Sequence, residues 1–301
     1  MPFSGVTGML AAWLVGPAGV GCFWWWRRRQ RARRPPAMGA DLLRGPGHSE
    51  RERLDEEQVR VARDLFLLCL VPLLFLLAYR LFPRASDFHR PWAESLVGLA
   101  FGAWMTWRVL RGLARIDRGR AAFDAQRTVG QELDQLMRGG AAVFHDFPAD
   151  GFNIDHVVVS TQGVFAVTTR AVEPHRRGRG RAGATVRFDG HVLAFPKRST
   201  SEPLEQAQRH AQWLSVWATG SVGGMVCVTP VLALPGWFVD RTGRSPVMVY
   251  SGRALGSLLN TPSKQPLSEL DVERIAHQVE QRCRTAGPPL NGAAPPRAVD
   301  A

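Results

Sequence analysis

The hydrophobic pattern divides the chain into an apolar first part and a mixed second part. Three long apolar runs lie in the first part, and each approaches the roughly 20 residues that a helix needs to cross about 30 Å of hydrocarbon. From about residue 116 onward, apolar positions recur with the shorter periods of helices and strands. We expect a membrane anchor over 1–115 with transmembrane helices at about 3–26, 65–82 and 92–110, a globular domain over 116–286, and a disordered Pro- and Ala-rich tail over 287–301.

Charges beside the apolar runs predict their orientation. The first run ends in three Trp at 24–26, and six Arg follow between residues 27 and 34. Residues 1–121 hold 19 Arg against 10 Asp and Glu, so most of the formal net charge of +12 lies next to the apolar runs. Such clusters mark the inner side of a membrane. We therefore expect an integral protein of a bacterial-type inner membrane, with its N-terminus outside and its C-terminal domain in the cytoplasm.

Two alternatives to this arrangement remain open. The first run could be a cleaved signal peptide, although it lacks a basic segment before its apolar stretch. The third run is the weakest, because Glu94 and Arg108 lie near its two ends. If that run lay flat on the membrane, the predicted orientation would be reversed.

The second part of the chain has the element order of an α/β domain. Strands at 153–160 and 163–170 are joined by two residues, which predicts that they are antiparallel neighbours. Asp189-Gly190 predicts the turn of a second hairpin over 184–195. Further strands are expected at 141–147, 225–234 and 246–250, and helices at 120–138, 201–217 and 267–284, with a solvated helix over the mixed-charge run 49–57.

Several classes of site are absent from the sequence. The four Cys (22, 69, 227 and 283) form no CxxC pair and no disulfide pattern. No Gly-rich phosphate loop and no nucleophile elbow occur. A zinc ribbon, a disulfide scaffold and a P-loop enzyme are therefore disfavoured.

A set of short motifs in the second part resembles a known family. They are Gly130-Gln131-Glu132, Val143-Phe144-His145-Asp146, Asn153 to Ser160 (NIDHVVVS) and Gly163 to Val167 (GVFAV). Together they resemble the nuclease-related domain (NERD) family over about residues 120–285. The resemblance implies a restriction-endonuclease-like core of the PD-(D/E)xK superfamily, in which helices flank a mixed central sheet. Members of the family are often attached to membrane helices or to other nucleic-acid enzymes.

The resemblance also implies a metal site for phosphodiester hydrolysis. Such a site uses Mg²⁺ held by converging carboxylates, with a Lys that helps to orient or deprotonate the attacking water. Asp155 stands at the family's strand-borne metal ligand, and Glu132 matches its acidic position on the preceding helix. Both residues are candidate metal ligands, and Mg²⁺ is the expected cofactor if the site is active.

The next strand departs from the family pattern. Val167 should be followed by Glu-x-Lys, but this chain has Thr168-Thr169-Arg170. A neutral Thr168 is a poor Mg²⁺ ligand, and the guanidinium of Arg170 cannot act as a base. Glu173 could replace the missing carboxylate only if the strand bulged. Whether the chain is an enzyme stays open: an active site would make it a Mg²⁺-dependent endo- or exodeoxyribonuclease, and the substitutions could also be peculiar to this chain.

An Arg-rich segment follows this strand. Its candidate nucleic-acid-binding residues are Arg176, Arg177, Arg179 and Arg181. Arginines in a Gly-rich loop suit the phosphate backbone of DNA, and they suit anionic lipid equally. Glu205 and Gln206, on the helix at 201–217, could face the site or solvent.

Two functional hypotheses follow from the sequence. The first is a membrane-anchored NERD protein, descended from metal-dependent DNA hydrolases and catalytically impaired at Thr168 and Arg170. The second is a non-catalytic, membrane-tethered module for protein interaction or nucleic-acid binding. The expected partners are the lipid bilayer and, as a candidate, DNA.

Overall fold

The structure is a computed structural model that describes residues 43–81, 91–172, 184–260 and 265–285. It divides into two compact units, which we describe separately. One comprises residues 53–118 of the described chain, and the other comprises 43–52 together with the residues from 119 onward. The predicted run 3–26 and the predicted tail 287–301 lie outside the described residues.

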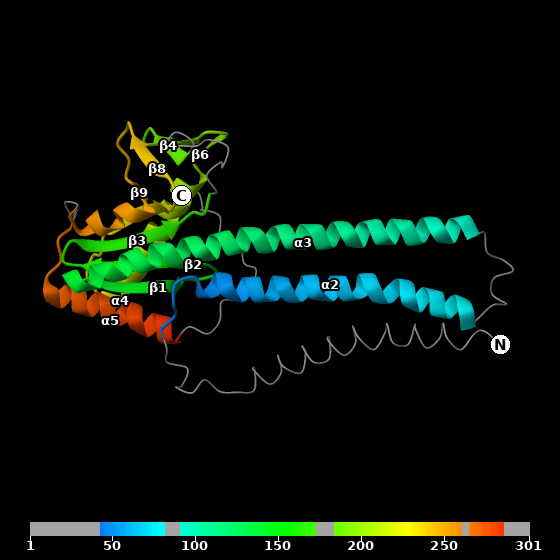
Figure 1. Cartoon of the computed structure of the whole chain (residues 1–301). Helices are drawn as coiled ribbons and strands as arrows, with labels where there is room; N and C mark the ends of the chain where they lie inside the picture. Colours follow the sequence, from blue (N-terminus) through cyan, green and yellow to red (C-terminus); the bar gives the residue numbers. More distant parts are fainter. Residues whose placement is uncertain (1–42, 82–90, 173–183, 261–264, 286–301) are drawn as a thin grey trace, which may run out of the picture. The chain divides into compact units, whose positions relative to one another are not determined.

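A five-stranded mixed sheet is the centre of the second unit (Figure 1). The first three strands pair antiparallel in chain order, whereas β3, β7 and β9 pair parallel. Parallel neighbours require a crossover connection, and α4 (Glu202–Val222) lies between β3 and β7 in the chain. The order across the sheet is β1 (Ala142–Pro148), β2 (Asn153–Ser160), β3 (Gly163–Thr169), β7 (Val228–Leu234) and β9 (Met248–Ser251).

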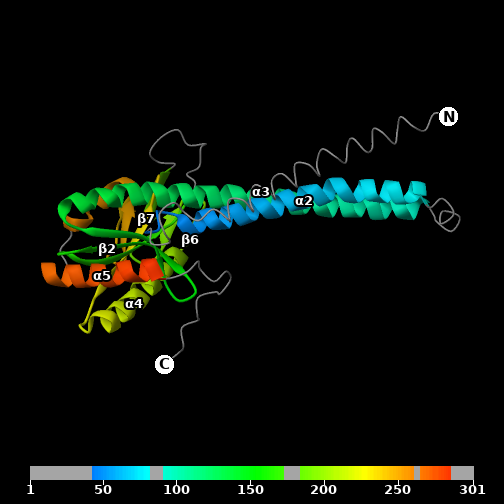
Figure 2. The same ribbon diagram turned by 90° about the horizontal axis from the view of Figure 1, so that it is seen from below.

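Helices cover both faces of this sheet, as Figure 2 shows. On one face, Val129 and Leu133 of α3 (Pro91–Asp134) pack with Val158 of β2. The 3-10 helices η2 (Gln135–Gly139) and η4 (Gly252–Asn260) complete that layer. On the other face, α4 and α5 (Glu269–Thr285) bury Leu214 and Ile275 against the sheet. The predicted mixed α/β fold with flanking helices is therefore confirmed.

A smaller four-stranded sheet lies beside the main one in the same unit. Its order is β6 (Arg198–Thr200), β5 (Leu193–Phe195), β4 (Thr185–Phe188) and β8 (Phe238–Arg241). The predicted hairpin is present as β4 and β5, and Gly190 in its turn has a φ of 104°. A Cβ on Gly190 would lie 2.3 Å from the carbonyl oxygen of Arg244, so the turn requires glycine.

The first unit is an antiparallel pair of long helices, formed by α2 (His48–Leu81) and α3. Their contact buries Val61 and Leu54 on α2, with Met105, Val109 and Ile116 on α3. A Cβ on Gly112 would come within 2.4 Å of a Val61 methyl group, so the backbones approach closely there. The predicted helix at 49–57 is confirmed as the start of α2. The segments 92–110 and 120–138 were expected as separate helices. No Pro interrupts residues 92–134, and α3 joins the two segments and ends at Asp134, where η2 follows.

The described chain gives no transmembrane helix. None of its helices combines the length and the apolar character needed to cross a membrane. Side chains are described for residues 65–71 of the second predicted span and for 98–110 of the third, and each stretch is shorter than the roughly 20 residues that a span needs. The predicted spans and the predicted domain limits stay predictions.

Candidate functional site

The strands that carry the candidate site separate at one end. Pairing between β2 and β3 stops at His156 and Val167, whereas β3 continues to pair with β7 as far as Thr169. Asp155 lies at this separation. Its Oδ2 accepts a hydrogen bond of 2.6 Å from the Thr169 N–H, and its Oδ1 accepts one of 2.9 Å from Gln126 Nε2 on α3. The Asp155 carboxylate therefore accepts the hydrogen bond that a backbone carbonyl of β2 would accept if the pairing with β3 continued.

The position expected for the family's Glu is buried and neutral. Thr168 is only 2% exposed, and its hydroxyl lies 3.1 Å from Nδ1 of His210 on α4. The ring of Phe152 stacks on His210 with a centroid separation of 5.0 Å. Burial lowers the pKa of His210 to about 4, and the neighbouring Arg209 charge acts in the same direction. At neutral pH this pair is an uncharged hydroxyl bonded to an uncharged imidazole.

The position expected for the family's Lys is held by an ion pair. Arg170 Nη2 lies 3.5 Å from Oε1 of Glu202, in the first turn of α4. The Arg170 backbone N–H donates 3.0 Å to the carbonyl of Ala233 on β7, which continues the parallel ladder by one residue. Glu202 thus partly neutralises the guanidinium beside the separated strands.

Glu132 is not brought to Asp155 by any described contact. It is half-buried on α3, whereas the bond to Asp155 comes from Gln126, about 9 Å earlier along the helix axis. Sequence reasoning missed Gln126. The available signal was its position three residues before the buried Val129, on the same helix face.

A chain of polar side chains lies between the sheet and α3. His145 Nδ1 is 2.8 Å from His156 Nδ1, and His145 Nε2 is 2.9 Å from Asp134 Oδ1. His156 is fully buried, and burial first and then the His145 charge hold its pKa well below the usual histidine range. Among the described residues, His156 Nε2 and Thr169 Oγ1 are buried without a hydrogen-bond partner. His156 is therefore part of the core.

Asp146, the last residue of the VFHD motif, holds the segment before α2. Its φ of 52° is unusual for a residue other than glycine. Its carboxylate accepts hydrogen bonds from Ser49 Oγ and, at 3.0 Å, from Asn153 Nδ2. Arg44 Nη1 lies 3.5 Å away, and both charged side chains are nearly buried. This cluster fastens residues 44–49 to the domain.

Comparison with protein families finds one similarity that overlaps this geometry. Residues 121–235 match the nuclease-related domain family, NERD. The match covers β1, β2, β3 and α4, and with them Gln126, Asp155, Thr168, Arg170, Glu202 and His210, but not Arg44 or Ser49. Searches of curated proteins and of solved structures returned no match.

The candidate site has few ligands that suit Mg²⁺. Across the described ranges, no group of three or more His, Cys, Asp or Glu side chains could hold a metal ion. Mg²⁺ prefers carboxylate oxygens in octahedral geometry. Asp155 offers a carboxylate that is already hydrogen-bonded to Thr169 and Gln126, and Thr168 offers a hydroxyl bonded to His210. This set does not fit Mg²⁺, so we derive no catalytic step through a metal.

The remaining candidate residues have other surroundings. Glu205 is exposed, and its Oε1 accepts a 2.6 Å hydrogen bond from Ser201 Oγ, the residue that precedes α4. This contact fastens the first turn of α4. Gln206 is half-buried, and no described contact ties it to Asp155. Glu173, Arg176, Arg177, Arg179 and Arg181 lie outside the described residues.

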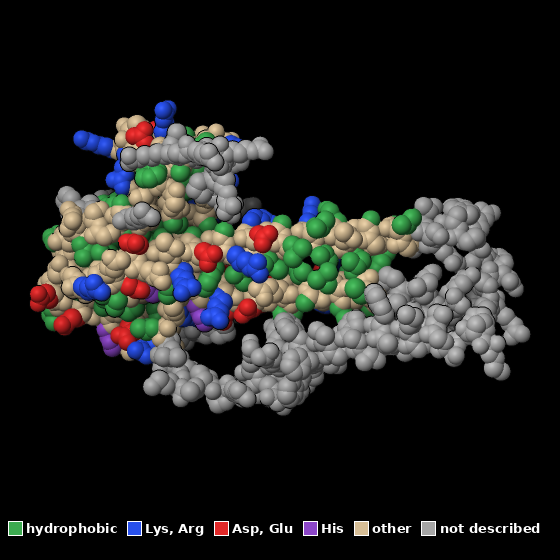
Figure 3. Space-filling model, in the orientation of Figure 1, with side chains coloured by type: hydrophobic (Ala, Val, Ile, Leu, Met, Phe, Trp, Pro, Cys, Tyr) green, Lys and Arg blue, Asp and Glu red, His purple; other side chains and the backbone are tan. Residues whose placement is uncertain are grey.

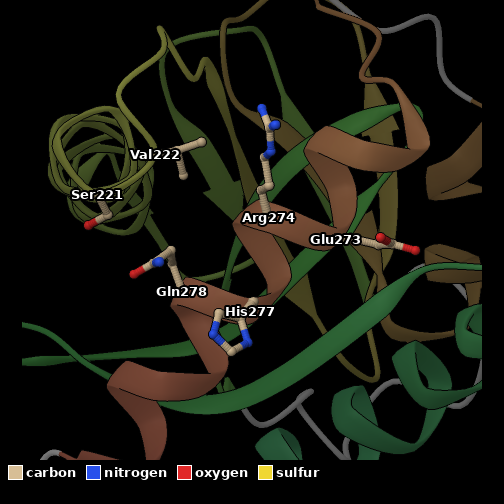
Figure 4. A pocket seen from close by; sticks show the side chains of 6 residues that line it. All are labelled: Ser221, Val222, Glu273, Arg274, His277 and Gln278. Atoms are coloured by element: carbon tan, nitrogen blue, oxygen red, sulfur yellow. The ribbon is translucent and has the colours of Figure 1, made fainter.

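A separate pocket lies between α4 and α5 (Figure 4). It has a volume of about 320 Å³ and is lined by Ser221, Val222, Glu273, Arg274, His277 and Gln278. Ser221 lies at the carboxyl end of α4, whereas Glu202 and His210 belong to the amino-terminal half of that helix. The pocket is therefore not part of the Asp155–Thr168 site.

Proposed function

We propose that the NERD domain of this chain is a nucleic-acid-binding module that does not hydrolyse phosphodiesters and is tethered to a membrane. The proposal rests on the contacts of the two residues that depart from the family's Glu-x-Lys motif. Thr168 is buried and bonded to His210, and Arg170 is paired with Glu202. Descent from restriction-endonuclease-like nucleases is part of the proposal and rests on the family resemblance.

The chemistry of hydrolysis supports the first half of this proposal. Metal-assisted attack on a phosphodiester requires a bound cation that polarises the phosphate and activates a water. Replacing a carboxylate by Thr168 removes a negative charge from the ligand set. Replacing an ammonium by Arg170 leaves a group that cannot accept a proton from water. If the site is active despite this, Mg²⁺ is the cofactor to expect.

Basic side chains support binding to nucleic acid. The sequence between β3 and β4 contains Arg176, Arg177, Arg179 and Arg181. On and beside the small sheet, Arg187, Lys197 and Arg244 are exposed, and none has an ion-pair partner among the described residues. Such a distribution favours sequence-independent, salt-sensitive contact with phosphates. The alternative is a module that binds a protein partner.

The apolar runs support the tether. Two of them extend beyond the described side chains at the far end of α2 and the near end of α3, and the third lies before residue 43. Arginine clusters beside these runs favour the cytoplasmic placement of the NERD domain.

Binding and cleavage should be measured together on the full chain. Fluorescently labelled single- and double-stranded DNA is incubated with the protein and Mg²⁺ at several salt concentrations, and both its retention and its length are recorded. We expect retention that weakens steeply as salt rises, with the DNA intact. Cleavage by the natural chain that Asp155→Asn abolishes would overturn the non-catalytic proposal. Lack of retention at low salt would favour the protein-partner alternative.

A further inference from the structure

Two ion pairs cross-link the helical hairpin at different levels along its length. Nearer the start of α2, Arg115 Nε lies 3.2 Å from Oε2 of Glu57. Seven residues later on α2 and seven residues earlier on the antiparallel α3, Arg108 donates hydrogen bonds of 3.0–3.1 Å to both carboxylate oxygens of Asp64. At a rise of 1.5 Å per residue, the two levels are about 10 Å apart.

The exposed side chains of α2 change from polar or small to apolar at Asp64, which belongs to the second ion pair. Up to Arg63, the exposed positions of α2 in this unit are polar or small: Arg53, Asp55, Gln58, Arg60, Ala62 and Arg63. Immediately beyond Asp64, the exposed positions are Leu65, Leu67 and Cys69. An apolar outer face is unusual for a helix that already buries one side against a partner.

α3 also exposes apolar side chains, and this apolar surface extends past the level of Asp64 to Leu113, between the two ion pairs. Leu99 is 71% exposed and Leu110 is 60% exposed, and Trp104, Trp107 and Leu113 are also exposed. At about 100° per residue, these five side chains cover roughly half of the helix circumference. Met105, Val109 and Ile116 occupy the buried side. This length of α3 is apolar on both sides. Figure 3 shows hydrophobic side chains on the face of the hairpin that is in view.

On α3, two Trp–Arg contacts lie near the Asp64–Arg108 pair. The guanidinium carbon of Arg108 lies 5.1 Å from the centroid of the Trp104 ring, and that of Arg111 lies 3.8 Å from Trp107. Indole rings concentrate at membrane–water interfaces. Arginine can rest its stem on apolar surface there while its charge reaches the headgroups.

We propose that the hairpin enters lipid between its two ion pairs. The Glu57–Arg115 pair lies in water, the Asp64–Arg108 pair lies in the headgroup layer, and the exposed side chains of Leu65, Leu67 and Leu99 contact acyl chains. The distance of about 10 Å between the pairs is comparable to the polar layer on one side of a bilayer, about 5–8 Å. This inference rests on the proposed tether and identifies the surface and depth at which it operates.

Lipid fits this surface better than a second copy of the chain. A protein partner covers one stripe of a helix, whereas the exposed apolar side chains lie on both helices and cover about half of α3. On both helices the exposed apolar side chains begin only beyond the Glu57–Arg115 pair, at Leu113 on α3 and at Leu65 on α2.

Two positions on one face of α2 provide a matched test. Gln58 and Cys69 are both exposed, and eleven residues place them on the same side of the helix about 16 Å apart. The full chain carrying Cys22→Ala and Cys227→Ala is labelled at Cys69 with a fluorescent maleimide. Cys283 can stay, because burial raises the pKa of its thiol to about 12 and keeps it unreactive. The matched variant has Gln58→Cys together with Cys69→Ala.

Both labelled chains are incorporated into phosphatidylcholine–phosphatidylglycerol vesicles and exposed to two quenchers. We expect bromine on the lipid acyl chains to quench the label at 69 at least threefold more than the label at 58, and aqueous iodide to show the reverse order. Strong iodide quenching at both positions, in chains that float with the vesicles, would refute the proposed surface while leaving the tether intact. Protection of position 69 from both quenchers would indicate a protein partner instead. Failure to float would refute the tether and this inference together.

Discussion

Lowering the pH should destabilise the α/β domain through His210. Burial lowers the pKa of this imidazole from 6.5 to about 4, so the unfolded chain takes up a proton at a pH where the folded chain does not. Stability from this group is complete above pH 6.5, falls as the pH drops, and is fully lost below about pH 4. The pKa difference corresponds to about 3 kcal/mol, of which about 2.5 kcal/mol is lost by pH 4.5.

Pulse proteolysis of the full chain in urea measures this loss. The free energy of unfolding is compared at pH 7 and pH 4.5 for the natural chain and for His210→Gln, which keeps a polar partner for Thr168 but does not titrate. Other groups, including His156, titrate in both chains, so their contributions to the loss of unfolding free energy cancel when the two chains are compared. We expect the natural chain to lose about 2.5 kcal/mol more than the variant. Equal losses would show that His210 is not kept neutral by its burial, and the reasoning about Thr168 and His210 would be wrong.

Substitutions at three further positions test other parts of the account, each by the shift in the urea midpoint. Asp146→Ala leaves the nearly buried Arg44 without its carboxylate and should destabilise the domain by about 3 kcal/mol; a loss below about 1 kcal/mol would contradict the cluster's role. Asp155→Ala removes the acceptor for the Thr169 N–H and should cost about 2 kcal/mol, whereas Asp155→Asn keeps an acceptor and should cost about half as much. Equal effects of the two would argue against that bond. Gly190→Ala forces a Cβ toward the Arg244 carbonyl and should cost about 2 kcal/mol, so an unchanged midpoint would be inconsistent with the turn.

The main sheet could be predicted from the sequence because its strands combine strong β-propensity with clear turns. Residues 153–160 and 163–169 are rich in Val and are joined by Thr161-Gln162, and the structure places them as antiparallel neighbours. The small sheet was only half predicted. β6 has three residues and β8 has four, and none of their side chains is buried, so neither gives an alternating pattern.

The sequence indicates which residues belong to the candidate site, but it does not indicate which other residues they contact. Thr168 and Arg170 could be identified as departures from a motif, but their partners His210 and Glu202 are 42 and 32 residues further along the chain. Gln126 was missed because an amide on a helix carries no sequence signal for a metal or a base. Its bond to Asp155 depends on how α3 lies on the sheet, which periodicity does not specify.

Metal-dependent DNA cleavage by a restored motif tests the central claim most directly. The full natural chain and the double variant Thr168→Glu with Arg170→Lys are each incubated with supercoiled DNA and Mg²⁺ or Mn²⁺, and a triple variant that adds Asp155→Asn serves as the control. The account predicts that the natural chain leaves the DNA intact, that the double variant nicks it, and that the triple variant does not. Nicking by the natural chain at a rate equal to that of the double variant would contradict the claim that Thr168 and Arg170 disable the site.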